Sequence, residues 1–154
     1  LIGAGEFEKV KKRVWTTLIY SMVIAVGITA ILYLNAENIF HIFTSDVQII
    51  ALGKKILFIE LFLEIGRTVN ILMTKCLTAM GDVIFPVVIG IIFMWLVAVM
   101  GGYYLGVYKG MGLVGIWIAM AIDECARGAL FVVRFQSERW KCKMVQTSHQ
   151  AKLA

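Results

Sequence analysis

The stretch that decides the fold is residues 85–107, which read FPVVIGIIFMWLVAVMGGYYLGV. This stretch contains no Asp, Glu, Lys, Arg or His. Because an α-helix rises about 1.5 Å per residue, it is long enough to cross the roughly 30 Å hydrocarbon core of a bilayer. We therefore expect residues 85–107 to form a transmembrane helix.

The composition of the whole chain is that of a membrane protein. The chain has 154 residues, of which 60% are hydrophobic and 16% charged, and its mean hydropathy is +0.86. A soluble domain is about half apolar and about a quarter charged. Further apolar stretches cover residues 14–34, 47–80 and 113–135. We predict an all-α, polytopic membrane helix bundle of about four transmembrane helices, forming a single membrane domain over residues 1–154 with a cytoplasmic tail at 136–154.

The basic residues are distributed unevenly between the two sides of this bundle, which explains the net charge of +5 without a nucleic-acid partner. The side with both termini carries Lys9, Lys11, Lys12, Arg13, Lys75, Arg134, Arg139, Lys141, Lys143 and Lys152. The other side carries Lys54, Lys55 and Lys109. Cytoplasmic loops hold the excess of Lys and Arg in membrane proteins. We therefore expect a multi-pass protein of the plasma membrane with both termini in the cytoplasm.

Local signals mark the ends of the predicted helices. Ser45 precedes Gln48 by three residues, which is the spacing of a capping box at the start of the second stretch. Gly81-Asp82 interrupts the apolar run before the third stretch. Pro86 then falls where the first turn of a helix accommodates proline. These signals predict a continuous second helix and a short connection to the third.

The second apolar stretch carries a polar stripe. At about 100° per residue, its polar side chains fall on one half of a helix; they are Glu60, Glu64, Arg67, Thr68, Asn70, Thr74, Lys75 and Thr78. A charge at mid-bilayer costs about 2.5–3.5 kcal/mol, so these side chains must face protein or water. We favour a polar cavity wall for a substrate or coupling ion, formed by Glu60, Glu64, Arg67, Asn70 and Thr74. The alternative is a self-neutralising Glu64–Arg67 pair that only joins helices.

A second charged group lies in the fourth stretch and comprises Asp123, Glu124 and Arg127. Arg127 follows Asp123 by four residues and Glu124 by three, so it can pair with either acid on one helix face. One arginine leaves one of the two acids uncompensated. Burial and a neighbouring like charge both favour the protonated form of a carboxyl group. The group is therefore either a proton site or an interhelical salt bridge.

No pattern in the sequence indicates an enzyme, a bound metal or an organic cofactor. The cysteines Cys76, Cys125 and Cys142 are scattered and odd in number, so neither a disulfide framework nor a zinc site follows. His41 and His149 have no neighbours of the kind that bind metals. We find no nucleophile–base pair.

Several motifs, in order along the chain, resemble those of the multidrug and toxic compound extrusion (MATE) transporters. The strongest are Glu64-Ile-Gly-Arg67-Thr-Val-Asn70 and Leu77-Thr-Ala-Met-Gly81-Asp82-Val-Ile-Phe85-Pro86. Others are Gly3-Ala4-Gly5-Glu6, Phe43-Thr-Ser-Asp46, and Gly112-Leu-Val-Gly115-Ile-Trp117-Ile-Ala119 followed by Asp123-Glu124 and Arg127. Family members have twelve transmembrane helices in two pseudo-symmetric lobes. The chain resembles helices nine to twelve, the end of the C-terminal lobe.

The resemblance implies an antiporter that exports organic, often cationic, compounds in exchange for a proton or sodium ion. In some members an aspartate of the tenth helix helps bind the coupling ion. That position falls near Arg67 here, and Glu64, one turn earlier, is the nearest acid. We expect Glu64 to bind the coupling ion, Arg67 to bias its protonation, and Asn70 with Thr74 to offer hydrogen bonds. Expected partners are membrane lipid, the missing remainder of the transporter and a small organic substrate.

Two other functions stay open from the residues alone. The first alternative is a non-transporting membrane assembly or scaffold module. The second is a flippase-type exporter of lipid-linked sugars. In a scaffold module the same charges serve as interhelical links, worth about 1–2 kcal/mol each.

Overall fold

The computed structural model describes residues 7–137. The predicted cytoplasmic tail beyond Ser137, the motif Gly3-Ala4-Gly5-Glu6, and Cys142 with His149 lie outside the described residues. Over the described part, the chain is built from α-helices and short, more widely wound helical turns, with no strand. The prediction of an all-α membrane helix bundle is confirmed.

Four long helical segments account for most of the described chain. They are α1 (Phe7–Leu34), α3 (Val47–Ala79), the segment Ile84–Tyr108 and α6 (Gly112–Gln136), while the short α2 (Ala36–Phe43) connects α1 to α3. The segment Ile84–Tyr108 comprises α4 (Ile84–Phe93), η1 (Met94–Val99), α5 (Met100–Tyr103) and η2 (Tyr104–Tyr108). In η1 and η2 each backbone N–H bonds one residue further back than in an α-helix. Each predicted apolar stretch thus corresponds to one long helical segment.

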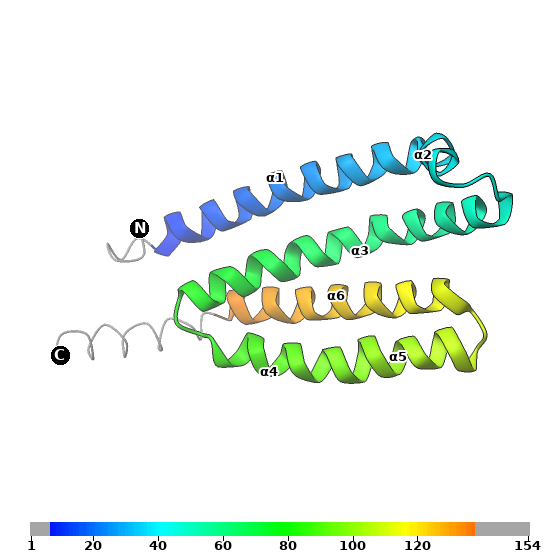
Figure 1. Cartoon of the computed structure of the whole chain (residues 1–154). Helices are drawn as coiled ribbons and strands as arrows, with labels where there is room; N and C mark the ends of the chain where they lie inside the picture. The colour runs from blue at the N-terminus through cyan, green and yellow to red at the C-terminus, as the bar shows by residue number, and fades with distance from the viewer. Residues whose placement is uncertain (1–6, 138–154) are drawn as a thin grey trace.

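The long segments lie side by side in a single layer (Figure 1). Helix α3 packs against α1 on one side and α6 on the other, and α6 packs in turn against the segment Ile84–Tyr108. Helix α1 begins and α6 ends at the same end of the layer, next to the turn between α3 and α4. The order in space is therefore α1, α3, α6 and Ile84–Tyr108.

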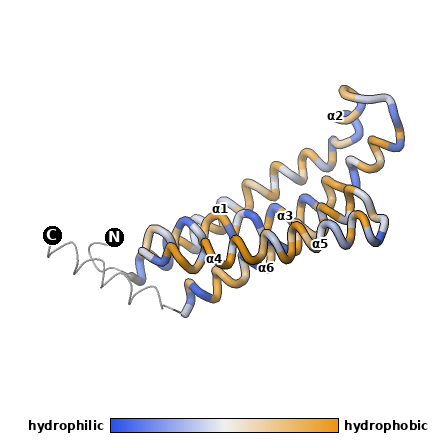
Figure 2. Tube along the Cα trace, turned by 60° about the horizontal axis from the view of Figure 1, so that its bottom comes forward, coloured by the Kyte–Doolittle hydropathy of each residue, from blue (hydrophilic) through white to orange (hydrophobic). Residues whose placement is uncertain are grey.

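Hydropathy separates these segments into two kinds. Glu8–Leu34 and Ile84–Tyr108 are long and apolar enough to cross a membrane, and only 11% and 6% of their most apolar windows are buried. Such exposure is unlike that of the core helices of a soluble protein, and Figure 2 shows the hydrophobic colour predominating along α4 and α5. Helices α3 and α6 have 33 and 25 residues but carry charges at mid-length. At about 1.5 Å per residue both still exceed the roughly 30 Å of a hydrocarbon core.

The ends of α3 are fixed by local hydrogen bonds. At its start Asp46 is the N-cap, and its Oδ1 accepts a hydrogen bond of 2.8 Å from the backbone N–H of Gln48. The predicted capping box at Ser45 is wrong, because the carboxylate of the following residue takes the capping position. At its end Gly81 adopts φ of 86°, and the N–H of Asp82 bonds the carbonyl of Leu77 at 2.9 Å. This left-handed glycine ends the helix in the usual way.

Helices α3 and α6 approach each other closely at glycines. A Cβ added to Gly66 would lie 2.6 Å from the backbone nitrogen of Cys125, and one added to Gly128 would lie 3.2 Å from the carbonyl oxygen of Gly66. Such spacing lets backbones come together, as small residues do in other membrane helix pairs. Next to this contact, buried side chains of α1, α3 and α6 form an apolar cluster at the end of the layer near the α3–α4 turn; they are Leu18, Met73, Leu77, Met80, Phe131 and Phe135.

We predict that Gly66→Ala destabilises the α3–α6 pair. The new methyl group would overlap the backbone of Cys125, and overpacking of this kind costs about 1–3 kcal/mol. Gly27→Ala is the matched control, since nothing lies within 4 Å of the position of its Cβ. Alanine favours a helix by about 0.5–1 kcal/mol over glycine, so the control is expected to be neutral or slightly more stable. The measurement is the free energy of unfolding in mixed detergent micelles, and equal losses in both variants would contradict the close approach.

Candidate functional site

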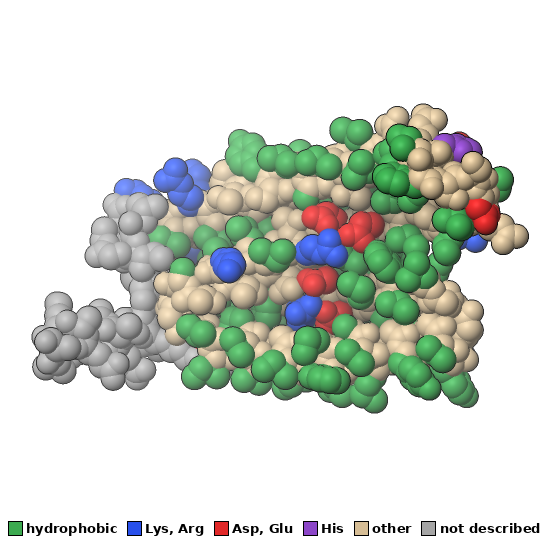
Figure 3. All heavy atoms as spheres, viewed as in Figure 1, with side chains coloured by type: hydrophobic (Ala, Val, Ile, Leu, Met, Phe, Trp, Pro, Cys, Tyr) green, Lys and Arg blue, Asp and Glu red, His purple; other side chains and the backbone are tan. Residues whose placement is uncertain are grey.

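Six charged side chains form a row across the middle of α3 and α6, which we call the charged band. Figure 3 shows acidic and basic side chains gathered there, with hydrophobic side chains on both sides. The band consists of Glu60, Glu64 and Arg67 from α3 and Asp123, Glu124 and Arg127 from α6. The two charged groups predicted separately from the sequence thus lie next to each other on one face of the layer.

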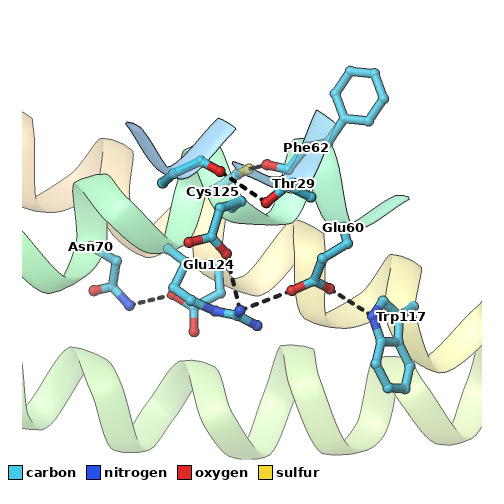
Figure 4. A network of polar contacts seen from close by, with 10 residues as sticks. Thr29, Glu60, Phe62, Asn70, Trp117, Glu124 and Cys125 are labelled. Atoms are coloured by element: carbon cyan, nitrogen blue, oxygen red, sulfur yellow. Dashed lines mark hydrogen bonds and ion pairs between the residues drawn. The ribbon is translucent and has the colours of Figure 1, made fainter. Parts of the chain in front are cut away.

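In the α3 half of the band, one guanidinium nitrogen serves two acids. Arg67 Nη1 donates to Glu60 Oε1 at 2.9 Å and to Glu64 Oε2 at 3.1 Å. The other oxygen of Glu60 accepts a hydrogen bond of 2.8 Å from the indole nitrogen of Trp117 on α6 (Figure 4). The Glu64–Arg67 pair expected from the spacing is present, and Arg67 binds Glu60 as well.

The α6 half repeats this arrangement. Arg127 Nη2 donates to Asp123 Oδ2 and to Glu124 Oε1, the latter at 2.9 Å. Arg127 therefore pairs with both acids at the same time, whereas the sequence left open which of the two it would bind. Glu124 Oε2 also accepts a hydrogen bond of 2.6 Å from Asn70 Nδ2 on α3 (Figure 4). Thr74 Oγ1 donates to Asn70 Oδ1 at 3.4 Å. All five stripe candidates therefore belong to hydrogen-bond networks that cross to α6. Glu60 and Asn70 bond to α6 directly, and the other three are connected through members of the stripe.

The charges of the band do not cancel. Four carboxylates face two guanidinium groups, an excess of two negative charges. Most of these side chains are 18–34% exposed, whereas Asp123 is 4% exposed. Because burial penalises an uncompensated charge, the band is suited to bind protons or cations.

Two hollows open beside the band. One of about 430 Å³ lies between α3, α4 and α6 and is lined in part by Asn70, Thr74 and Arg127. Another of about 260 Å³ runs between α1 and α3 and is lined in part by Glu64 and Arg67. Lys75 borders both. Except for Glu60, every stripe residue named as a candidate therefore borders a hollow, and the hydrogen bonds above connect Glu60 to Arg67.

A larger hollow of about 660 Å³ lies away from the band, where α2 meets α3. Its lining is mostly apolar and includes Tyr33 and Phe58. Lys55 is a charged member of the lining, and so are Glu37 and Lys54. Glu37 and Lys54 form an exposed ion pair of 2.8 Å. The hydrogen bond and positive charge of Lys54 lower the pKa of the Glu37 carboxyl group. Because its acid Glu37 is paired with Lys54 and the lining is mostly apolar, we place the candidate site at the band.

A further ion pair was missed by the sequence analysis. The carboxylate of Asp82 is fully buried and accepts a hydrogen bond of 2.8 Å from Arg134 Nε. The guanidinium of Arg134 also lies 4.7 Å from the ring centre of Phe85. The sequence had suggested only a turn at Asp82 and a cytoplasmic base at Arg134. The pair fixes the α3–α4 turn to the end of α6.

The described part of the chain is thus a layer of long, mostly apolar helices with a charged band at mid-length. The MatE family model matches residues 1–104, and the chain belongs to this family, that of the multidrug and toxic compound extrusion transporters. The resemblance drawn from the motifs is confirmed, and the family consists of transporters rather than enzymes.

Curated relatives agree with this family. The chain is 32% identical over 139 residues to the uncharacterized transporter YisQ of Bacillus subtilis, an alignment that covers 90% of the chain and 30% of the relative. It is 31% identical over 154 residues to the probable multidrug resistance protein NorM of Thermotoga maritima, covering 97% of the chain and 32% of the relative. The chain thus spans about a third of the length of these relatives. No solved structure matches the chain.

We predict that Arg134→Leu destabilises the protein strongly. The substitution leaves the buried carboxylate of Asp82 without its guanidinium, and removing one partner of a buried ion pair costs about 3–5 kcal/mol. The double variant Asp82→Asn/Arg134→Leu removes both charges and is expected to recover a large part of this loss. The measurement is the free energy of unfolding of the single variant and of the double variant, each compared with the unsubstituted protein. Equal losses would show that the charge of Asp82 is not what Arg134 compensates.

Proposed function

We propose that the chain forms part of a cation-coupled secondary antiporter that exports organic, drug-like compounds, with the charged band as its coupling site. The observation that carries the proposal is the excess of two negative charges at mid-length of α3 and α6. Such charges within membrane helices are costly and mark ion or substrate pathways. The description of the Thermotoga relative as a probable multidrug resistance protein supports the substrate class.

The band provides a physical basis for exchange. A cationic compound and a coupling ion both lower its negative charge, so binding of one weakens binding of the other. Ligands that favour different states of a protein shift its equilibrium by the difference in their affinities. Couplings of about 1–3 kcal/mol between two such ligands are typical. Influx of a proton or sodium ion would in this way drive release of the exported compound.

The residues of α3 take distinct roles in this proposal. Glu64 binds the coupling ion, because its carboxylate borders the hollow beside α1 and, among residues 7–137, has only the shared Arg67 as a donor. Arg67 holds Glu60 and Glu64 together and biases their protonation. Asn70 and Thr74 border the hollow beside α4 and offer polar groups to a substrate.

The rest of the transporter is supplied by further helices in this proposal, since the chain spans about a third of its relatives. These helices would cover the face of the layer that carries the band, because charged side chains do not face lipid in stable membrane proteins. The protein resides in the plasma membrane with the start of α1 and the end of α6 on the cytoplasmic side. Four basic residues at the start of α1, which are Lys9, Lys11, Lys12 and Arg13, fit an interface with anionic lipid.

The test is Glu64→Gln in the transporter that contains this chain. Ethidium, the probe cation, is supplied outside everted membrane vesicles, whose outer face is the cytoplasmic one, and an outward-directed proton or sodium gradient energises its transport into the lumen. We expect gradient-driven ethidium transport to fall about 5- to 150-fold, the range that corresponds to loss of a typical coupling free energy.

Glu37→Gln is the matched control, because Glu37 is an exposed glutamate of α2 that lies outside the band. It is expected to leave transport near the unsubstituted level. Unchanged transport by Glu64→Gln under both gradients would exclude Glu64 as the coupling residue. Absence of ethidium transport by the unsubstituted protein would exclude this drug-efflux activity.

A further inference from the structure

We propose that the coupling ion is a proton and that Asp123 on α6 is a carboxyl group that takes it up. This inference rests on the proposed antiport function and adds the identity of the ion and a second residue that binds it. It is carried by the way hydrogen-bond donors are divided among the four acids of the charged band.

The four acids differ in the number of donors that stabilise their charge. Glu60 accepts from Arg67 and Trp117, on different oxygens. Glu124 likewise accepts from Arg127 and Asn70, on different oxygens. Hydrogen bonds to the ionised form of a carboxyl group favour that form. Glu60 and Glu124 are therefore the acids of the band with a hydrogen-bond donor on each carboxylate oxygen.

Within the described part of the chain, Glu64 and Asp123 each accept one hydrogen bond, from a guanidinium nitrogen shared with another acid. These two acids match the two negative charges that the arginines leave uncompensated. Neutralising both would make the band formally neutral, with one guanidinium group for each remaining carboxylate. The band thus contains two carboxyl groups suited to take up a cation and two suited to hold the arginines.

Burial distinguishes Asp123 from Glu64. The side chain of Asp123 is 4% exposed, against 22% for Glu64. The oxygen Oδ1 of Asp123 is buried and has no hydrogen-bond donor among residues 7–137. The nitrogen Nε of Arg127 is also buried and has no acceptor among these residues. A buried carboxylate with one unsatisfied oxygen is costly, and adding a proton to that oxygen removes the charge. Asp123 is therefore the acid of the band that gains most from protonation.

The surrounding groups favour a proton over a metal cation. Among the described residues, no group of three or more His, Cys, Asp or Glu side chains is arranged to hold a metal ion. Hard metal cations need several oxygen ligands, whereas the oxygens of Glu124 and one oxygen of Asp123 are already bonded to nitrogen donors. A proton needs a single oxygen, and Oδ1 of Asp123 provides it.

The charged groups near Asp123 come from two helices. On α6 they are Glu124 and Arg127, and on α3 they are Glu60, Glu64 and Arg67. The segment 84–107, which packs against the other side of α6, carries no Asp, Glu, Lys, Arg or His. Protonation of Asp123 leaves Arg127 paired with Glu124 alone and reduces the negative charge beside the hollow that Arg127 lines. Proton uptake would in this way weaken the binding of an organic cation.

Infrared spectroscopy of the transporter that contains this chain, in lipid nanodiscs, tests proton uptake directly. The readout is the C=O stretch of a protonated carboxyl group during a pH titration, with Asp123→Asn and Glu124→Gln as the variant pair. We expect the titrating carboxyl absorption to lose the component of Asp123 in Asp123→Asn and to keep this component in Glu124→Gln. Loss of this absorption component in Glu124→Gln alone, or an unchanged absorption in Asp123→Asn, would overturn the assignment. Circular dichroism verifies that both variants are helical, and Asp123→Glu, which restores the carboxyl group, provides a second titrating variant.

Transport by the protein that contains this chain tests the role of this proton. In proteoliposomes, ethidium movement is expected to follow a pH gradient and not a sodium gradient, and Asp123→Asn is expected to lower the pH-driven rate tenfold or more. Asp123→Glu should restore part of it. Transport driven by sodium alone would overturn the proton assignment while leaving antiport intact. Absence of any ethidium transport would count against the antiporter, and the infrared titration would still decide whether Asp123 takes up a proton.

Discussion

Charged side chains in the middle of a membrane helix must find partners inside the protein, because hydrocarbon offers neither water nor counter-ions. Helices α3 and α6 meet this requirement together and not separately. Glu60 on α3 uses the indole of Trp117 on α6, and Glu124 on α6 uses the amide of Asn70 on α3. These bonds form only when the two backbones are close, which the contact at Gly66 permits. The rest of the layer is arranged around this pair, with apolar helices on both flanks.

The parts of the structure that depend on local sequence were predictable. The apolar stretches gave the long helical segments, and the Gly81-Asp82 pair gave the turn before α4. Helical periodicity placed Glu64 and Arg67 on neighbouring turns, where they do pair. Each of these features depends on residues within about one or two turns of one another, and spacing along the chain decides such contacts.

The features that were missed depend on contacts between distant residues. Trp117 lies 57 residues from Glu60, and Arg134 lies 52 residues from Asp82. No periodicity within one helix contains this information. The cap at Asp46 was missed for a different reason, since two adjacent residues could both cap α3 and only the geometry of the chain selects one. The close junction of the two charged groups into one band also follows from helix packing and not from the sequence of either helix.

The arrangement of the helices in one layer has a thermodynamic consequence. A layer one helix thick has two broad sides and little interior, so most of its side chains meet whatever molecules adjoin it. Its stability is therefore linked by mass action to those neighbours, as that of a subunit is linked to its oligomer. A melting temperature measured on these helices is then a property of the surrounding lipid and protein as much as of the chain, and it will vary with their concentration.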